Sequence, residues 1–264
     1  MKCKWIKKLT AGIIFLAAVG SLSGCQKAAT SENLFRDIEV NMTSVESAEE
    51  NQIVKLQMGD GDSAISQESN LDIEMIRNPA AVHRKGQQKT NMAGTKETQE
   101  MESYQVEEDG KTVIYSGTDE AWEKNAVEEK ETSSQQTVLF DGLQNLSGAF
   151  SVSQDLATVN KEECFELTGT ISGTQFQETF ADTLKALLGE DSSDLSGWNL
   201  QASEDEENNE ELQKKLNNVK VDCVIDIYRS NILPAKITFD LTDYLKAAGE
   251  ENAQVTSYTL EVTF

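Results

Sequence analysis

Residues 165–184, FELTGTISGTQFQETFADTL, decide the fold class, because their hydrophobic period changes within the segment. The first half alternates apolar and polar residues, as a half-buried strand does, and the second half repeats apolar residues at helical spacing. Thr174 and Gln177 form a capping-box pair at the start of the helix, and Gly189 ends it. The segment therefore predicts a strand followed directly by a helix. Its apolar positions are Phe165, Leu167 and Ile171, then Phe176, Phe180, Leu184 and Leu188.

The sequence on both sides of this segment contains further alternating runs, which are typical of half-buried antiparallel strands. Asp109 and Gly110 separate two strand-like runs and predict a hairpin, whereas Pro79 predicts a turn or an edge. The chain is therefore predicted to be rich in antiparallel strands. The clearest runs are VKLQM (54–58), LDIEMI (71–76), VKVDCVIDIY (219–228), AKITFDL (235–241) and SYTLEVTF (257–264).

Two other segments add helical or irregular structure. The stripe formed by Leu139, Leu143, Leu146 and Phe150 predicts a second amphipathic helix. The acidic and polar stretch 190–217 predicts a loop that is helical only near NEELQKKL (209–216). A short helix or loop is expected at TDYLKAAGEE (242–251). Together these patterns predict an α+β fold with two or three helices.

The N-terminus predicts where the protein resides. A basic start, MKCKWIKK, precedes an apolar run over 10–22, which is shorter than the roughly 20 residues of a membrane span. LSGC (22–25) then matches a lipobox, in which Cys25 receives a diacylglyceryl group with acyl chains such as palmitate and becomes the first residue. The alternative is an ordinary secretory signal with an incidental cysteine. We expect a signal peptide at 1–24, a lipidated cysteine and polar leash at 25–33, and one domain at 34–264, anchored on the extracytoplasmic face of the cell membrane.

Composition excludes several kinds of partner and chemistry. The chain has 23 basic and 46 acidic residues and a formal net charge of −23, which argues against nucleic acid and anionic lipid surfaces as electrostatic partners. His83, the only histidine, lies in the basic, turn-like stretch AAVHRKG without a nucleophile motif, and a solvated surface position is expected for it. DGDSAISQE (60–68) lacks the order of a calcium loop and predicts a polar turn. The sequence contains no zinc-site spacing. We expect no enzymatic activity, no metal and no cofactor.

Cys164 and Cys223 are the two cysteines that remain in the mature chain. An even pair in an exported protein suggests a disulfide. The alternation argues against one, because Cys164 shares a strand face with Glu166 whereas Cys223 shares its face with Ile225 and Ile227. A disulfide would require a bulge in one strand, so both states remain open.

The order of these segments resembles the LolA-like and LppX-like lipoproteins. YQVEEDGKTVIYSGTDEAWEKN (104–125) and NPAAVHRKG (78–86) are similar to segments of small exported lipoproteins of Gram-positive bacteria. Residues 165–184 and VDCVIDIYRSNILPAKITFDLTDYL (221–245) resemble the second half of the fold, with Asp226 and Pro234 at the matching strand end and turn. The acidic loop 190–217 lies outside the pattern. The resemblance implies a strongly curved antiparallel sheet, a half-barrel, with helices covering its concave face.

The resemblance also implies a function, because members with known roles hold acyl chains in the concavity. We expect a lipoprotein tethered to the membrane through Cys25 that binds an acyl chain or glycolipid. The alternative is a non-catalytic interaction module with a filled core, which binds an envelope protein or a cell-wall component; periodicity does not distinguish a core from an apolar pocket. The residues expected to line the concavity are Leu139, Leu143, Leu146, Phe176, Phe180, Leu184, Tyr258, Leu260 and Val262.

Overall fold

The computed structural model describes residues 29–59, 64–108, 111–118, 121–127, 142–188, 206–248 and 254–264. Of residues 118, 125–127, 181–188, 206–211 and 248 it describes the backbone alone. The predicted signal peptide, Cys25, Leu139, the Asp109–Gly110 turn and Gly189 lie outside the described residues, and so does the side chain of Leu184.

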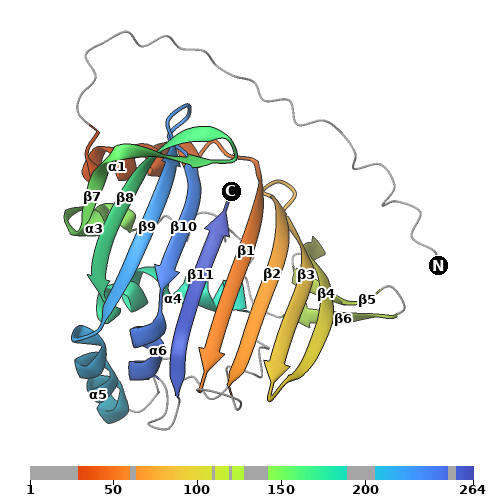
Figure 1. The fold of residues 1–264 in the computed structure, drawn as a ribbon. Coiled ribbons are helices and arrows are strands. Elements are labelled where there is room, and N and C mark those ends of the chain that lie inside the picture. The colour runs from red at the N-terminus through yellow and green to blue at the C-terminus, as the bar shows by residue number, and fades with distance from the viewer. Residues whose placement is uncertain are drawn as a thin grey trace.

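Eleven strands form one open antiparallel sheet, in the order β6-β5-β4-β3-β2-β1-β11-β10-β9-β8-β7 (Figure 1). Strands β6 and β7 are its two edges, and β1 pairs with β11 in the middle. The predicted fold class, a curved antiparallel half-barrel with helices, is confirmed. The strands are β1 (Ser47–Met58), β2 (Ile65–Ile76), β3 (Ala81–Met92), β4 (Thr95–Glu108), β5 (Lys111–Thr118), β6 (Ala121–Val127), β7 (Phe150–Val159), β8 (Glu162–Ser172), β9 (Lys220–Tyr228), β10 (Pro234–Asp240) and β11 (Val255–Thr263).

The helices cover one face of the half of the sheet that runs from β7 to β11. Figure 1 shows α4 behind β10 and β11, α6 below the tip of β10, and α1 at the upper ends of β7 and β8. α1 contacts β7, α4 contacts β8 and β9, and α6 contacts β9 and β11. We call this covered side the inner face and the opposite side the outer face. The helices are α1 (Ser31–Met42), α3 (Leu143–Leu146) with the 3₁₀ turn η3 (Ser147–Ala149), α4 (Gly173–Leu188), α5 (Glu206–Asn217) and α6 (Thr242–Ala248).

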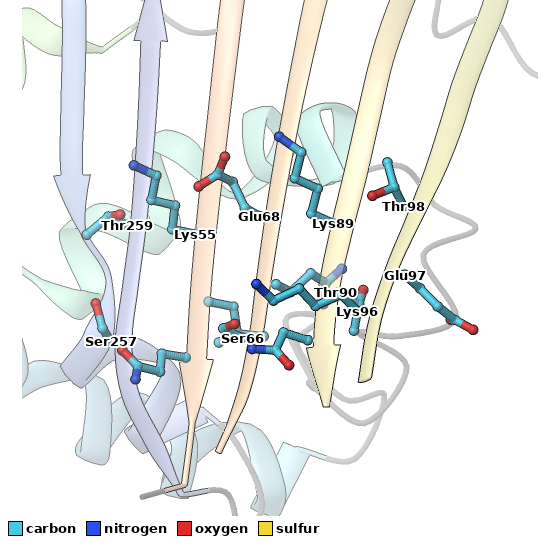
Figure 2. A pocket seen from close by; sticks show the side chains of 14 residues that line it. Lys55, Ser66, Glu68, Lys89, Thr90, Lys96, Glu97, Thr98, Ser257 and Thr259 are labelled. Atoms are coloured by element: carbon cyan, nitrogen blue, oxygen red, sulfur yellow. The ribbon is translucent and has the colours of Figure 1, made fainter. Parts of the chain in front are cut away.

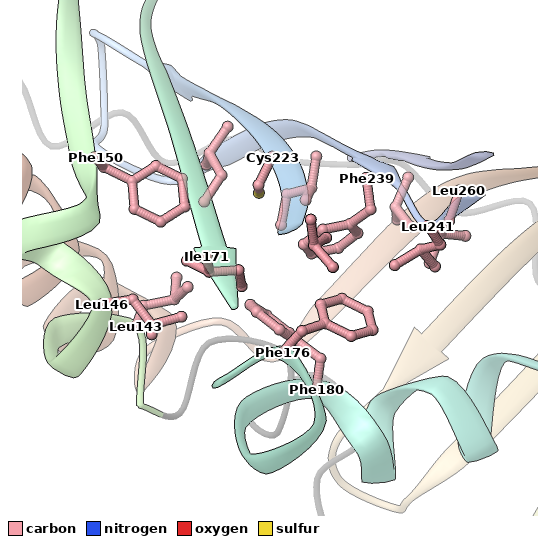
Figure 3. Close-up of a cluster of buried hydrophobic side chains, with 14 of the residues drawn as sticks. Leu143, Leu146, Phe150, Ile171, Phe176, Phe180, Cys223, Phe239, Leu241 and Leu260 are labelled. Carbon is pink, nitrogen blue, oxygen red and sulfur yellow. The ribbon is translucent and has the colours of Figure 1, made fainter. Parts of the chain in front are cut away.

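The main hydrophobic core lies between these helices and the inner face. Figure 3 shows Phe176 and Phe180 of α4 pointing towards Phe239 of β10, while Leu143 and Leu146 approach from α3. The ring centroids of Phe180 and Phe239 are 4.9 Å apart, and those of Phe176 and Tyr244 are 5.1 Å apart. Both pairs are edge-to-face, a favourable arrangement of aromatic rings. The predicted helix over 174–188 is therefore confirmed, and Phe176 and Phe180 of its predicted apolar face are buried.

The capping box of α4 differs from the predicted pair. The Ser172 hydroxyl accepts from the Gln175 backbone N–H at 3.1 Å, and the Gln175 side-chain oxygen accepts from the Ser172 backbone N–H at 3.0 Å. The predicted pair was wrong because the last residue of β8 itself caps the helix. Thr174 instead donates to Asn217, and the Gln177 side chain accepts from Gln213 at 2.8 Å. These two contacts link α4 to α5.

Two other boundaries also differ from the prediction. The polar leash was expected to extend to residue 33, but α1 begins at Ser31, and the Thr30 side chain caps it by accepting from the Asn33 N–H at 3.3 Å. Phe35 and Ile38 of this helix are fully buried, so the segment belongs to the core. The helix predicted from the stripe Leu139–Phe150 also ends earlier than expected, because α3 ends at Leu146 and Phe150 already starts β7.

The two cysteines are free and buried on opposite faces of the sheet. Cys223 belongs to the main core, whereas Cys164 packs in a small separate cluster with Val159 and Ala235. Cys164 lies opposite Tyr228 and Cys223 lies opposite Gly169, so the two positions fall on opposite sides of the β8–β9 pleat. The question that the sequence left open is therefore answered in favour of two thiols.

Gly86 in β3 is a position where the sheet tolerates no side chain. A Cβ added there would overlap the backbone oxygen of Asn70 and lie 2.9 Å from the Leu71 Cα. Because backbone cannot move aside as a side-chain end can, we expect Gly86→Ala to lower the free energy of unfolding by about 1–3 kcal/mol. Gly148→Ala is the matched control, since nothing lies within 4 Å of its added Cβ. Urea titration of both variants tests this, and equal midpoints for the two would contradict it.

Candidate functional site

The inner face of β1 changes character along the strand. Leu56 lies in the main core and Val54 packs against it, but the next inner positions are Gln52 and Glu50, both of which are buried. In the ladder Gln52 lies between Val262 of β11 and Leu71 of β2. Gln52 and Glu50 therefore follow Leu56 and Val54 along the same face of β1, so buried polar residues adjoin the main core on this strand.

Gln52 is a buried amide without hydrogen-bond partners. Its side chain is 1% exposed, and neither Nε2 nor Oε1 has a partner among the described residues. An unpaired buried polar group costs about 1–3 kcal/mol, so this position is unfavourable for the fold on its own. Such a group in a native structure calls for a functional or structural explanation.

Glu50 and Arg84 lie on the same face, in the row of paired residues that neighbours the row of Gln52. In the register Glu50 is opposite Ile73, and Ile73 is opposite Arg84, so the two charged residues flank one apolar residue. Burial raises the pKa of Glu50 to about 7, against the opposing effect of the Arg84 charge. Burial also lowers the pKa of Arg84, whose Nη1 donates to the Gln105 side chain at 3.3 Å. We call Glu50, Gln52 and Arg84 the inner polar group.

An apolar strip runs beside the inner polar group. Ile73 and Met75 of β2 are buried, yet neither belongs to the main core cluster. Val82 and Ile114 share this face through the pairs Met75–Val82 and Gln105–Ile114, and both are half-buried, as is Leu71. The inner face of β1 to β5 is thus amphipathic. We call Leu71, Ile73, Met75, Val82 and Ile114 the inner apolar strip.

The residues predicted to line the concavity lie mainly in the packed core. The seven whose side chains are described are all buried, and Phe176 and Phe180 contact each other at 5.4 Å between ring centroids. One of them borders the inner polar group, because Val262 lies opposite Gln52. Contact of this set with a ligand stays a prediction. The seven are Leu143, Leu146, Phe176, Phe180, Tyr258, Leu260 and Val262.

Two hollows among the described residues are lined mainly by polar and charged residue types. The larger, of about 480 Å³, lies on the outer face, where Figure 2 shows Lys55, Glu68 and Lys89 side by side on β1, β2 and β3. These three residues are direct neighbours in the strand register. The smaller, of about 260 Å³, lies between α3 and α4 near Asn145 and Glu178. Neither lining suits an acyl chain.

The prediction for His83 was wrong in its local structure. Its stretch is part of strand β3 rather than a turn, since every residue from Ala81 to Met92 pairs with β2. The ring is partly buried on the outer face, stacked on Tyr104 at 4.3 Å between centroids, and Nε2 lies 3.0 Å from the Glu102 carboxylate. The Tyr104 hydroxyl donates to the same carboxylate at 3.1 Å. These contacts are cross-strand packing contacts.

The sequence analysis missed the inner polar group, although a signal for it exists. Glu50 and Gln52 precede Val54 and Leu56 by even numbers of residues, so they share the face that was predicted to be buried. Because both residues are polar, the buried face of the strand was predicted to begin only at Val54. Arg84 was missed because its stretch was interpreted as a turn.

The fold and this face define the class of protein: an open antiparallel half-barrel with a helix-covered core at one end and an amphipathic inner face at the other. The chain belongs to the family of unknown function DUF6612, whose model matches residues 30–261. No curated protein matches the chain. Among the described residues, no helix has the length and hydropathy required to cross a bilayer.

Two solved structures of similar fold are mycobacterial. One is LprF from Mycobacterium bovis, with 11% identity over 88% of this chain and 90% of that chain and a TM-score of 0.45. The other is the Mycobacterium tuberculosis lipoprotein LppX, with 16% identity over 88% of this chain and 92% of that chain and a TM-score of 0.41. LppX, whose group the sequence was predicted to resemble, is thus among the structures to which this chain is similar.

Proposed function

We propose that this protein is a non-catalytic, extracytoplasmic lipoprotein, anchored through Cys25, that binds an acyl chain or glycolipid on the inner face of its sheet. The observation that carries the proposal is the inner apolar strip, because its apolar side chains lie on the inner face without belonging to the main core. Apolar area removed from water contributes about 25 cal/mol per Å² before the entropic cost of holding the ligand.

The predicted lining residues have a place in this proposal. Tyr258, Leu260 and Val262 of β11 are the cross-strand neighbours of Leu56, Val54 and Gln52, so they join the main core to the inner polar group. Acyl chains on the strip would meet the core at this row. Leu143, Leu146, Phe176 and Phe180 then lie beside the site, in the main core that covers the β7–β11 half of the sheet.

A second candidate function is an interaction module with a filled core. The burial of all seven described lining residues favours it. In that case the partner would contact the outer face, where β1 to β4 carry both acidic and basic side chains, among them Lys55, Glu68 and Lys89.

Native mass spectrometry of the full chain, expressed in a bacterium and purified from the envelope in mild detergent, tests the proposal. The expected covalent mass is that of residues 25–264 with a diacylglyceryl group, and the matched Cys25→Ser chain should lack it. A further non-covalent adduct of lipid mass, lost on gentle activation in both chains, supports ligand binding. A clean covalent mass, with no uptake of dioleoyl lipids from added vesicles, would favour the filled-core module.

A further inference from the structure

The inner polar group specifies the kind of lipid head group that the site accepts. We propose that Gln52, with Glu50 and Arg84 beside it, binds the uncharged, hydroxyl-bearing head group of an acyl lipid whose chains lie on the inner apolar strip. The inference rests on the proposed function, because without lipid binding there is no head group to recognise. The hydrogen bonds that the buried side chains require define this class of lipid.

Gln52 requires a partner that both donates and accepts. Its amide nitrogen can donate two hydrogen bonds and its oxygen can accept two, and neither atom has a partner among the described residues. Each hydroxyl group of a sugar or glycerol donates one hydrogen bond and accepts others, so one head group satisfies both atoms. A fatty-acid carboxylate or a phosphate diester only accepts, and would leave the Gln52 oxygen unpaired.

The charges around Gln52 disfavour an ionic head group. Glu50 and Arg84 lie on either side of Ile73, on the same face, so a phosphate attracted by Arg84 would also face the Glu50 carboxyl group. The chain as a whole carries a formal charge of −23. An uncharged head group avoids repulsion from Glu50 and from the net negative charge of the chain. Its hydroxyls can hydrogen-bond to the Glu50 or the Arg84 side chain.

The apolar strip is placed to hold the chains of the same lipid. Ile73 lies directly between Glu50 and Arg84, and Leu71 lies directly opposite Gln52. Met75 and Val82 form the next inner row, away from Gln52. A lipid whose head group meets Gln52 therefore places its chains against side chains of matching polarity.

Binding of three probes to the full chain tests the inference: diglucosyl dioleoylglycerol, dioleoylphosphatidylmethanol and oleic acid, each presented in vesicles or micelles and measured by native mass spectrometry. The wild-type chain should retain the diglucosyl lipid at least tenfold better than phosphatidylmethanol, whose phosphate diester carries no hydroxyl group. Gln52→Leu should lower retention of the diglucosyl lipid about tenfold and leave oleic acid unchanged. It should also raise the thermal midpoint, because an unpaired buried amide is removed.

Gln87→Leu is the matched control, since it makes the same change on the outer face of β3. Gln52→Met, which keeps the length of the side chain, replaces Gln52→Leu should the latter fail to fold. A wild-type chain that retains none of the three probes would refute the proposed function. A wild-type chain that retains all three equally, or a Gln52 variant with an unchanged preference, would refute the head-group inference alone.

Discussion

Phe180→Asp is expected to abolish cooperative folding. The Phe180 side chain is 1% exposed, and its ring packs against Phe176 and Phe239 at 5.4 and 4.9 Å between centroids. Truncating a buried Phe costs about 3–5 kcal/mol, and an unpaired carboxylate in an apolar core adds several more. The sum approaches the whole stability of an ordinary domain, about 5–15 kcal/mol. Near-UV circular dichroism and urea titration measure the loss.

Leu156→Asp provides the control for this change. Leu156 lies on the edge strand β7 and is 43% exposed, so the same apolar-to-acidic change there should alter stability by less than about 1 kcal/mol. A Phe180→Asp chain with a native near-UV spectrum and a sharp unfolding transition would contradict the core assignment. It would then favour the earlier interpretation, in which Phe180 lines a ligand cavity.

The stability of the wild-type chain should fall as the pH rises from about 4.5 to above 7, through the titration of Glu50. Burial raises the pKa of Glu50 from 4.5 to about 7 in the folded state. Below pH 4.5 the carboxyl group is protonated in both states; between the two values the unfolded chain loses the proton first, so unfolding becomes easier. This pKa difference lowers the free energy of unfolding by about 3 kcal/mol once the pH exceeds 7.

Glu50→Gln should remove this part of the pH dependence. Unfolding free energies of both chains from urea titrations between pH 4.5 and 8 give the difference directly. The comparison is needed because burial also raises the pKa of Asp226, to about 6, which adds a slope of the same sign in both chains. Glu49→Gln, a change at an exposed neighbour, should keep the wild-type profile. Parallel profiles for the wild type and Glu50→Gln would show that Glu50 titrates normally.

The sequence predicted the parts of the fold in which burial and periodicity coincide. In β8, α4 and β11 the apolar residues repeat at the strand or helix period, because one face of each element contacts the core. It did not predict β3 or the start of β4, where polar side chains lie on both faces, as in RKGQQKTNM and TKETQE. Backbone hydrogen bonding to neighbouring strands defines these segments, and it leaves no hydrophobic pattern.

The candidate site was predicted only in part, for a related reason. The β11 residues Tyr258, Leu260 and Val262 were found because they are apolar and alternate. Gln52 and Arg84 were not found, because the residue type alone does not distinguish a buried polar side chain from a solvated one. Burial of such a residue depends on its cross-strand neighbours, and these are known only when the register is known.

The pairing of β1 with β11 has a consequence for how the chain is assembled. Strands β1 to β6 follow one another in sequence as they do in the sheet, and so do β7 to β11. The β1–β11 pairing, which runs from Asn51–Thr263 to Met58–Val255, joins the two halves. It is the only pairing of non-consecutive strands in the described sheet. This pairing forms only after β11 is available, so the β1 edge stays unpaired until β11 has been synthesised. A circular permutant that starts at β7 and ends at β6 would have neighbouring strands throughout and would form the same sheet without that delay.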